Sequence, residues 1–142
     1  MRDAFDADVL IYASIPGHAL GVRVAALFGA GMEQDAAVVG LGSVLLLPEV
    51  LSRPVREGAQ SQLAKLGEFL SRLELLPLDR PTAELAVALS SAYRLRAADA
   101  AHLATAVNAG ADRFLTNNQR DFPTSIAEIE IVYPEALPDV AT

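Results

Sequence analysis

Residues 5–13 read FDADVLIYA, and this stretch decides the fold because it joins an apolar run to two acidic residues. The apolar part, VLIYA, is typical of a strand buried in a parallel sheet, so residues 5–12 are predicted to form a strand. Aspartate is unfavourable in strands, and an ionised carboxylate in apolar surroundings is costly unless a partner or a cation compensates it. Strand alternation would place Asp6 and Asp8 on one face, unless one of them caps the strand end.

Short β-like runs alternate with amphipathic stretches along the rest of the chain. Helices are predicted over residues 18–30, 43–56, 60–73, 81–93 and 97–109, and further strands over residues 36–41, 75–78, 113–116 and 129–133. Pro48 lies inside the second of these helices and is expected to kink it or to mark its true start. This alternation implies a parallel sheet covered by helices on both faces, with ligands bound at the carboxyl ends of its strands.

The composition is that of a globular protein. Of 142 residues, 52% are hydrophobic and 20% are charged, so we expect one domain spanning residues 1–142. Cysteine is absent, which excludes disulfides and thiolate metal sites and makes the cytoplasm the expected location. The start, MRD, is unlike a signal peptide, and no apolar run reaches the ~20 residues of a membrane helix, so no membrane association is expected.

The charge balance narrows the class of function. A formal net charge of −7 argues against a protein that binds nucleic acid through a broad basic surface. It leaves room for an enzyme that meets nucleic acid locally through metal ions, because bound cations reverse the local field.

Most of the 18 acidic residues fall in turns or on polar helix faces, where solvation explains them. Asp6, Asp8, Glu49 and Asp99 stand out because their neighbours in the sequence are apolar. Buried carboxylates from separate elements do not usually gather without a cation, since like charges raise one another's pKa. An oxygen-only ligand set suits hard cations such as Mg²⁺ or Mn²⁺.

Purely structural roles stay open for these acids one at a time. Asp99 would then cap a helix, Glu49 would pair with Arg53, and Asp6 would pair with Arg2 or Arg120. The same choice applies to LTNNQRDF, residues 115–122, which follows the fourth predicted strand. Its small polar residues either form a turn or complete a carboxylate and amide cluster, and they are Thr116, Asn117, Asn118 and Asp121.

Three segments together resemble the PIN domain, and in particular the VapC-type toxin ribonucleases of prokaryotic toxin–antitoxin pairs. They are FDADVLIYA, LPEVLSRPVREG at residues 47–58, and AADAAHLATAVNAGADRFLTNNQRDF at residues 97–122. The resemblance spans almost the whole chain in the right order. It implies a PIN-like α/β/α sandwich with a central parallel sheet of about five strands. It also implies an Mg²⁺- or Mn²⁺-dependent endoribonuclease that cuts single-stranded RNA.

The resemblance assigns roles residue by residue. Asp6, Glu49 and Asp99 match the three acidic residues of the family and would hold the metal, with Glu49 a ligand or a residue that orients the attacking water. Many relatives have aspartate where this chain has Asn118, whereas others have asparagine there and an aspartate three residues later, here Asp121. Both are expected to contribute to catalysis, with Asn118 ligating through its carbonyl.

Further residues are expected to support this set. Thr116 matches a small hydroxyl residue that often follows the fourth strand of the family, and Asn117 adjoins it. Asp8 stands where the family often has asparagine, and it adds negative charge or contacts a metal ligand. His102, common in one PIN subgroup, is interpreted as a packing or hydrogen-bonding residue and not as a catalytic base.

Partners follow from the same resemblance. Phosphate contacts are predicted for four arginines near the acidic residues in the sequence: Arg53, Arg56, Arg96 and Arg120. A cognate antitoxin is expected, with its C-terminal segment over the helices and reaching toward the acidic cluster. A homodimer is also expected, and the leucine-rich faces of residues 18–28 and 60–73 serve either that contact or the core.

Two other classes of protein share part of this sequence pattern. A haloacid dehalogenase-type phosphatase also opens with a strand and an Asp-x-Asp pair, but it requires a lysine late in the chain. The only lysine here is Lys65, in the middle of the chain, and a receiver-type phosphoacceptor domain fails on the same point. A PIN fold that has lost catalysis and serves as an interaction module stays the main alternative.

Overall fold

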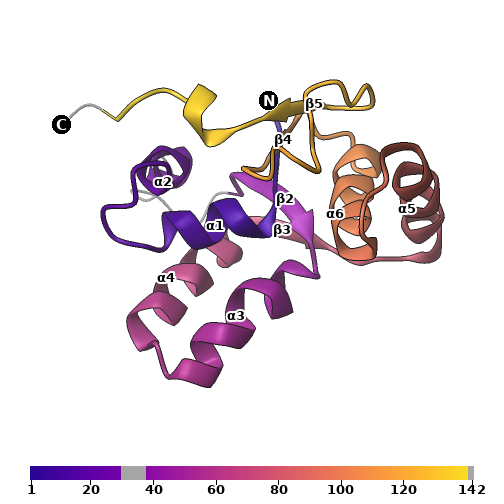
Figure 1. Ribbon diagram of the computed structural model, residues 1–142. Helices are drawn as coiled ribbons and strands as arrows, with labels where there is room; N and C mark the ends of the chain where they lie inside the picture. The colour runs from indigo at the N-terminus through magenta and orange to yellow at the C-terminus, as the bar shows by residue number, and fades with distance from the viewer. Residues whose placement is uncertain (30–37, 141–142) are drawn as a thin grey trace.

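A five-stranded sheet lies at the centre of the molecule (Figure 1). This computed structural model describes residues 1–29 and 38–140. The strands are β1 (Asp3–Phe5), β2 (Gly40–Ser43), β3 (Leu73–Leu76), β4 (Arg113–Leu115) and β5 (Glu130–Val132). Their order across the sheet is β3-β2-β1-β4-β5, and every neighbouring pair is parallel.

Helices cover both faces of the sheet, which confirms the predicted α/β/α sandwich (Figure 1). The helices are α1 (Ala7–Ala13), α2 (Gly21–Gly29), α3 (Leu46–Glu57), α4 (Gln60–Ser71), α5 (Arg80–Tyr93) and α6 (Ala97–Asn108), with a short 3₁₀ turn, η1 (Pro134–Ala136), near the C-terminus. Helices α1 to α4 pack on one face through a cluster that contains Phe5 and Leu115. Helices α5 and α6 pack on the other through Ala4, Leu41 and Phe114.

The order of the strands creates a switch point between β1 and β4. From β1 the chain moves outward to β2 and β3, then returns to the other side of β1 to form β4 and β5. The backbone N–H of Asp6 donates to the carbonyl of Leu115 at 2.9 Å, so the two strands end side by side. In open parallel sheets, ligands bind at this place.

The predicted first strand is wrong over most of its length. Strand β1 ends at Phe5, and the apolar run forms α1, in which Val9, Leu10 and Ala13 are buried. Asp6 ends the strand because its carboxylate accepts a hydrogen bond from the N–H of Ala7 at 2.8 Å, which caps the helix. The expected shared strand face of the two aspartates therefore does not exist.

The other predicted elements are present with shifted ends. Residues 36 and 37 of the second predicted strand lie outside the described residues, and β2 runs to Ser43. Helix α3 begins at Leu46, so Pro48 lies in its first turn. Of the two alternatives for this proline, a kink or the true start of the helix, the second is correct. Throughout residues 1–29 and 38–140, no helix is long and apolar enough to cross a membrane.

The leucine-rich faces considered for dimerisation belong mainly to the core. In α4, Leu66 and Leu70 are buried, and they share one hydrophobic cluster with Val24 and Phe28 of α2. These side chains are already used by the fold, so the homodimer remains a prediction that these faces do not support.

Candidate active site

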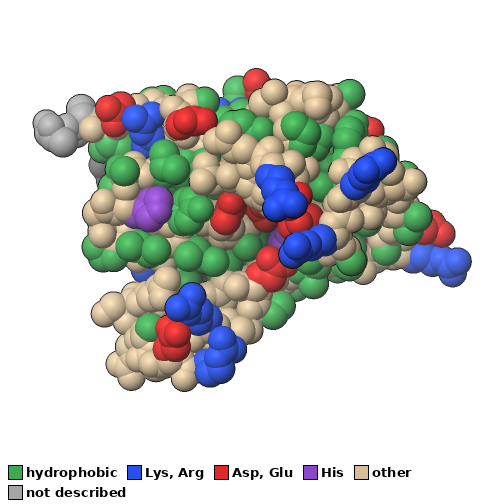
Figure 2. Space-filling model, in the orientation of Figure 1, with side chains coloured by type: hydrophobic (Ala, Val, Ile, Leu, Met, Phe, Trp, Pro, Cys, Tyr) green, Lys and Arg blue, Asp and Glu red, His purple; other side chains and the backbone are tan. Residues whose placement is uncertain are grey.

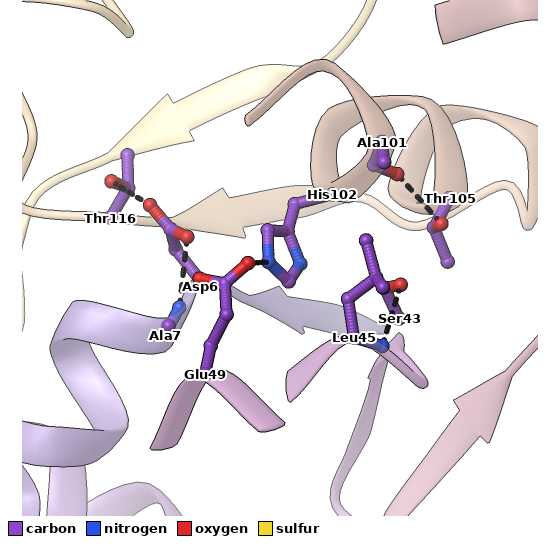
Figure 3. Close-up of polar contacts among 9 residues, drawn as sticks. All are labelled: Asp6, Ala7, Ser43, Leu45, Glu49, Ala101, His102, Thr105 and Thr116. Atoms are coloured by element: carbon purple, nitrogen blue, oxygen red, sulfur yellow. Dashed lines mark hydrogen bonds and ion pairs between the residues drawn. The ribbon is translucent and has the colours of Figure 1, made fainter. Parts of the chain in front are cut away.

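Asp6 occupies the switch point at the carboxyl end of β1. Its side chain is buried, and both carboxylate oxygens accept hydrogen bonds: Oδ1 from the N–H of Ala7, and Oδ2 from the Thr116 hydroxyl at 2.7 Å (Figure 3). Burial is the main cause that raises the pKa of Asp6, and the charge of Glu49 adds to it. The ion pairs considered for Asp6 with Arg2 or Arg120 are not formed. Its carboxylate instead accepts hydrogen bonds from Ala7 and Thr116.

The loop after β4 holds Asp8 as well as Asp6. Asp8 lies in the first turn of α1, and its Oδ2 accepts a hydrogen bond from the backbone N–H of Asn117 at 3.0 Å. Its Oδ1 is buried and has no hydrogen-bond partner within the described part of the chain. Burial, followed by the charge of Asp6, raises the pKa of Asp8 to about 7. Asp8 therefore adds an acidic group beside Asp6 from the same helix end.

Glu49 reaches the site from α3. Its Oε1 lies 2.8 Å from Nε2 of His102 on α6, so the considered pair with Arg53 is not formed (Figure 3). Arg53 instead pairs with Glu57, one turn further along α3. The interpretation of His102 as a hydrogen-bonding residue is confirmed by this contact. Because Glu49 interacts electrostatically with both Asp6 and Asp99, its carboxylate belongs to the acidic group at the switch point.

Asp99 joins the site from the first turn of α6. The residue that caps this helix is Arg96, so Asp99 is not the N-cap that one structural alternative supposed. Partial burial raises the pKa of Asp99, and the charges of Asp6 and Asp121 add to the rise. Burial and these like charges outweigh the favourable interaction of Asp99 with His102, so Asp99 is a good candidate ligand for a cation.

The last part of the site is the turn after β4. The Asn118 amide donates to Oδ2 of Asp121 at 3.0 Å, and the backbone N–H of Asn118 donates to the Thr116 hydroxyl at 3.1 Å. Thr116 thus connects the turn to Asp6. The segment forms a turn, and the charge of its Asp121 raises the pKa of Asp99. Its part in a metal-binding cluster stays a prediction.

The donor set fits a hard divalent cation in its chemistry. Four carboxylates from separate segments interact electrostatically, and the negative charges of neighbours raise the pKa values of Asp6 and Asp99. All four would bind an ion through oxygen atoms, and they belong to Asp6, Glu49, Asp99 and Asp121. Among the described residues, however, no three acidic or histidine side chains are already arranged to hold one ion. The Glu49 side chain is 36% exposed and Asp99 is half-buried, so solvent reaches both carboxylates.

The four predicted phosphate-binding arginines are all exposed: Arg53, Arg56, Arg96 and Arg120. Figure 2 shows acidic side chains gathered near the middle of one face, with Lys and Arg side chains at their border. Arg96 immediately precedes α6 and its Asp99, and Arg120 lies in the turn after β4. Arg53 lies one turn after Glu49 on α3.

A groove beside the site has no counterpart in the sequence-based predictions. It has a volume of about 1010 Å³ and is lined by side chains of α1, α2, α3 and α4, with Ile11, Val22 and Val50 among its apolar walls. Glu49 and Arg53 lie along its lining, so the groove adjoins the acidic group. Periodicity in the sequence gives no signal for it, because the groove depends on how these four helices pack together.

Comparisons with known proteins agree with this architecture. A model of the PIN domain family matches residues 5–124. The chain is similar to a toxin–antitoxin complex from Klebsiella pneumoniae, with a TM-score of 0.69 and 24% identity over 94% of this chain and 98% of that chain. No curated protein matches it.

Two further solved structures share the fold. One is VapBC2 from Rickettsia felis bound to a DNA fragment from the promoter, with a TM-score of 0.71 and 16% identity over 94% of this chain and 98% of that chain. The other is FitAB bound to an IR36 DNA fragment, with a TM-score of 0.66 and 19% identity over 96% of this chain and 97% of that chain.

Proposed function

The chain belongs to the PIN domain family, and from this premise we propose that it is a metal-dependent endoribonuclease, the toxin of a VapBC-type toxin–antitoxin pair. The observation that carries the proposal is the meeting of four acidic residues at the switch point, from the end of β1, α3, α6 and the turn after β4. We propose further that residues 1–142 form a single PIN domain that acts in the cytoplasm.

Each residue then has a role in hydrolysis of a phosphodiester bond. Asp6 and Asp99 would hold Mg²⁺ or Mn²⁺, with Asn118 and Asp121 binding a second ion or its waters. Bound there, the ion would supply Lewis-acid stabilisation of the phosphoryl oxygens and an acidified water. The free oxygen of Glu49 would bind an ion or orient the attacking water. These assignments rest on the resemblance and on the positions of the side chains.

Supporting residues keep the central carboxylate in place. The Thr116 hydroxyl and the Ala7 N–H fix the plane of the Asp6 carboxylate, so it is oriented before any ion arrives. Asn117 does the same for Asp8 through its backbone N–H. The exposed arginines Arg53, Arg56, Arg96 and Arg120 would bind phosphates of single-stranded RNA away from the reacting bond.

An antitoxin partner is supported by the solved structures of similar fold, whose descriptions name a toxin–antitoxin complex, VapBC2 and FitAB. We propose that the antitoxin of this protein lays its C-terminal segment along the groove between α1, α2, α3 and α4. Arg53 and Glu49 both line the groove, so a segment bound there would reach the acidic group. A homodimer is part of the proposal as well.

A test of the nuclease uses purified protein freed of any antitoxin and a panel of single-stranded and structured RNAs. We expect cleavage with Mg²⁺ or Mn²⁺ and none with EDTA. In Asp6→Asn and Asp99→Asn, the cleavage rate should fall by at least about 100-fold, since each variant removes a ligand. Glu84→Gln is the matched control, because it removes one charge from an exposed position on α5. Cleavage that survives EDTA and both aspartate variants would contradict the proposal.

The second candidate function is a PIN-fold interaction module without catalysis. It is favoured by the amide of Asn118 at the fourth acidic position and by the absence of a preformed ion-holding group in the described residues. This alternative expects no Mn²⁺ binding by the wild type and no change in any partner contact when Asp6 or Asp99 is replaced.

A further inference from the structure

His102 is a buried polar side chain whose position the core does not explain. Its imidazole is 1% exposed, and its neighbours in α6 are small or apolar buried residues, Ala101 and Leu103 among them. A polar group in such surroundings is costly unless it is hydrogen-bonded. Its one hydrogen bond in the described part of the chain joins Nε2 to Oε1 of Glu49 at 2.8 Å (Figure 3).

The partners of the two ring nitrogens determine where the proton lies. An ionised carboxylate only accepts hydrogen bonds, so Nε2 must carry the proton that it donates to Glu49. The other nitrogen, Nδ1, is buried and has no partner among the described residues. An N–H at that place would be left without an acceptor, which is costlier than a bare nitrogen. The contacts therefore select the tautomer with its proton on Nε2.

This hydrogen bond decides which oxygen Glu49 presents to the site. Oε1 is taken by His102, and Figure 3 shows the other oxygen of Glu49 on the side of Asp6. The charge of Glu49 also raises the pKa of Asp6, so the two carboxylates lie near each other. Without His102, a glutamate side chain that is 36% exposed would be free to turn about its three side-chain torsions into solvent.

His102 also links the two helices that supply acidic residues. Glu49 lies on α3, whereas His102 lies three residues after Asp99 on α6, a spacing that places both side chains on one side of that helix. A hydrogen bond from His102 therefore brings the Glu49 carboxylate toward the side of α6 that carries Asp99.

We propose that His102 is a positioning residue: its Nε2–H holds Oε1 of Glu49, so that Glu49 offers one defined oxygen to a divalent ion or its waters. The inference rests on the proposed function, because the ion is the group toward which Glu49 is held. His102 itself contacts neither the ion nor the RNA.

Three substitutions separate the hydrogen bond from the volume of the ring. In His102→Gln the side-chain amide nitrogen lies close to the position of Nε2 and keeps a donor for Glu49. In His102→Asn the amide nitrogen corresponds to Nδ1 and is too short to reach, and His102→Leu fills the space without any donor. Thermal unfolding in EDTA establishes that each variant is folded.

The first measurement is the Kd for Mn²⁺ by titration calorimetry, without RNA. We expect His102→Leu and His102→Asn to bind Mn²⁺ about 10–100-fold more weakly than the wild type, the usual effect of losing a residue that orients a metal ligand. His102→Gln is expected to stay close to the wild type. If all three variants bind Mn²⁺ as tightly as the wild type, the inference is overturned.

The second measurement needs neither metal nor activity. Imidazole ¹⁵N chemical shifts of the metal-free wild type are expected to show a protonated Nε2 and a bare Nδ1, with slow exchange of the Nε2 proton. In Glu49→Ala that exchange should become faster. A proton on Nδ1 in place of Nε2 would overturn the inference even if all variants bound Mn²⁺ weakly.

The two experiments also distinguish this inference from the proposed function. A wild type that binds no Mn²⁺ would overturn both the proposed function and the positioning role. A wild type that binds Mn²⁺ and loses nothing in His102→Leu would overturn the positioning role alone.

Discussion

Asp6 uses one carboxylate oxygen to cap α1 and the other to accept a hydrogen bond from Thr116. The same side chain therefore ends the strand, begins the helix and stands at the switch point. The sequence signal for this residue is its unfavourable setting, an acid beside an apolar run, and the structure places that residue at the switch point. The apolar run after it was predicted as a strand but forms α1. An aspartate that caps a helix and one that ends a strand give the same sequence pattern when the following run is short.

The partner of Glu49 could not be predicted from the sequence. His102 lies 53 positions further along the chain, whereas the considered partner, Arg53, is one helical turn away. Local spacing favours the near pair, but burial decides otherwise, since a buried imidazole needs the hydrogen bond more than an exposed guanidinium does. The pairing depends on how α3 and α6 are placed by the sheet.

At Asp8, we expect a pH-dependent cost to stability in the metal-free protein. Burial and the charge of Asp6 raise the pKa of Asp8 from an ordinary 3.8 to about 7. The folded state then binds the proton more tightly than the unfolded state, so this contribution to stability is full below about pH 4 and is lost as the pH rises to about 7. In EDTA, wild-type Tm should fall between pH 5 and pH 8.

Asp8→Asn should make that fall smaller and raise the Tm at pH 8 by at least about 2–4 °C, since each 1 kcal/mol of stability shifts the Tm by about that much in a chain of this size. Differential scanning calorimetry in EDTA measures it, with Glu84→Gln as the control whose pH dependence stays like the wild type. An Asp8→Asn variant that is less stable than the wild type at pH 8 would contradict this assignment.

At the scale of elements, helix and strand types were predicted well where the apolar spacing runs over several turns. Helices α4, α5 and α6 begin at or within one residue of their predicted starts. Strands were displaced by two to four residues at β2 and β3. A strand of three or four residues carries too few alternations to fix its ends, so pairing with neighbours decides them.

The packing of α1 against α2 depends on Gly21. A Cβ placed on this residue would lie 2.0 Å from the carbonyl oxygen of Tyr12, so the two helices approach with no space for a side chain. We expect Gly21→Ala to lower the free energy of unfolding by about 1–3 kcal/mol, because the backbone has to shift. Denaturant unfolding measures the change.

Gly67 in α4 provides the matched control. A Cβ at this position meets nothing within 4 Å, and the residue lies inside a helix. Gly67→Ala should therefore be neutral or raise the free energy of unfolding by roughly 0.5–1 kcal/mol through helix propensity. Similar effects of the two substitutions would contradict the close approach of α1 and α2.

In the whole molecule, two hydrophobic cores on opposite faces of one sheet hold the helices around the carboxyl ends of β1 and β4. Helices α1 to α4 pack on one face and α5 and α6 on the other, so α3 and α6 approach the switch point from opposite sides. Strand–helix alternation was enough to predict the sandwich and the edge at which the acidic residues meet. The groove and the Glu49–His102 contact required the actual placement of the helices.

We propose that the acidic group at the carboxyl ends of β1 and β4 holds a divalent cation. Anomalous diffraction from crystals soaked in Mn²⁺ tests it most directly, because the peak locates the ion without relying on activity. We expect a peak between Asp6 and Asp99, within reach of the free oxygen of Glu49, and no such peak in Asp6→Asn crystals. A wild-type crystal that binds Mn²⁺ only elsewhere, or not at all, would contradict it.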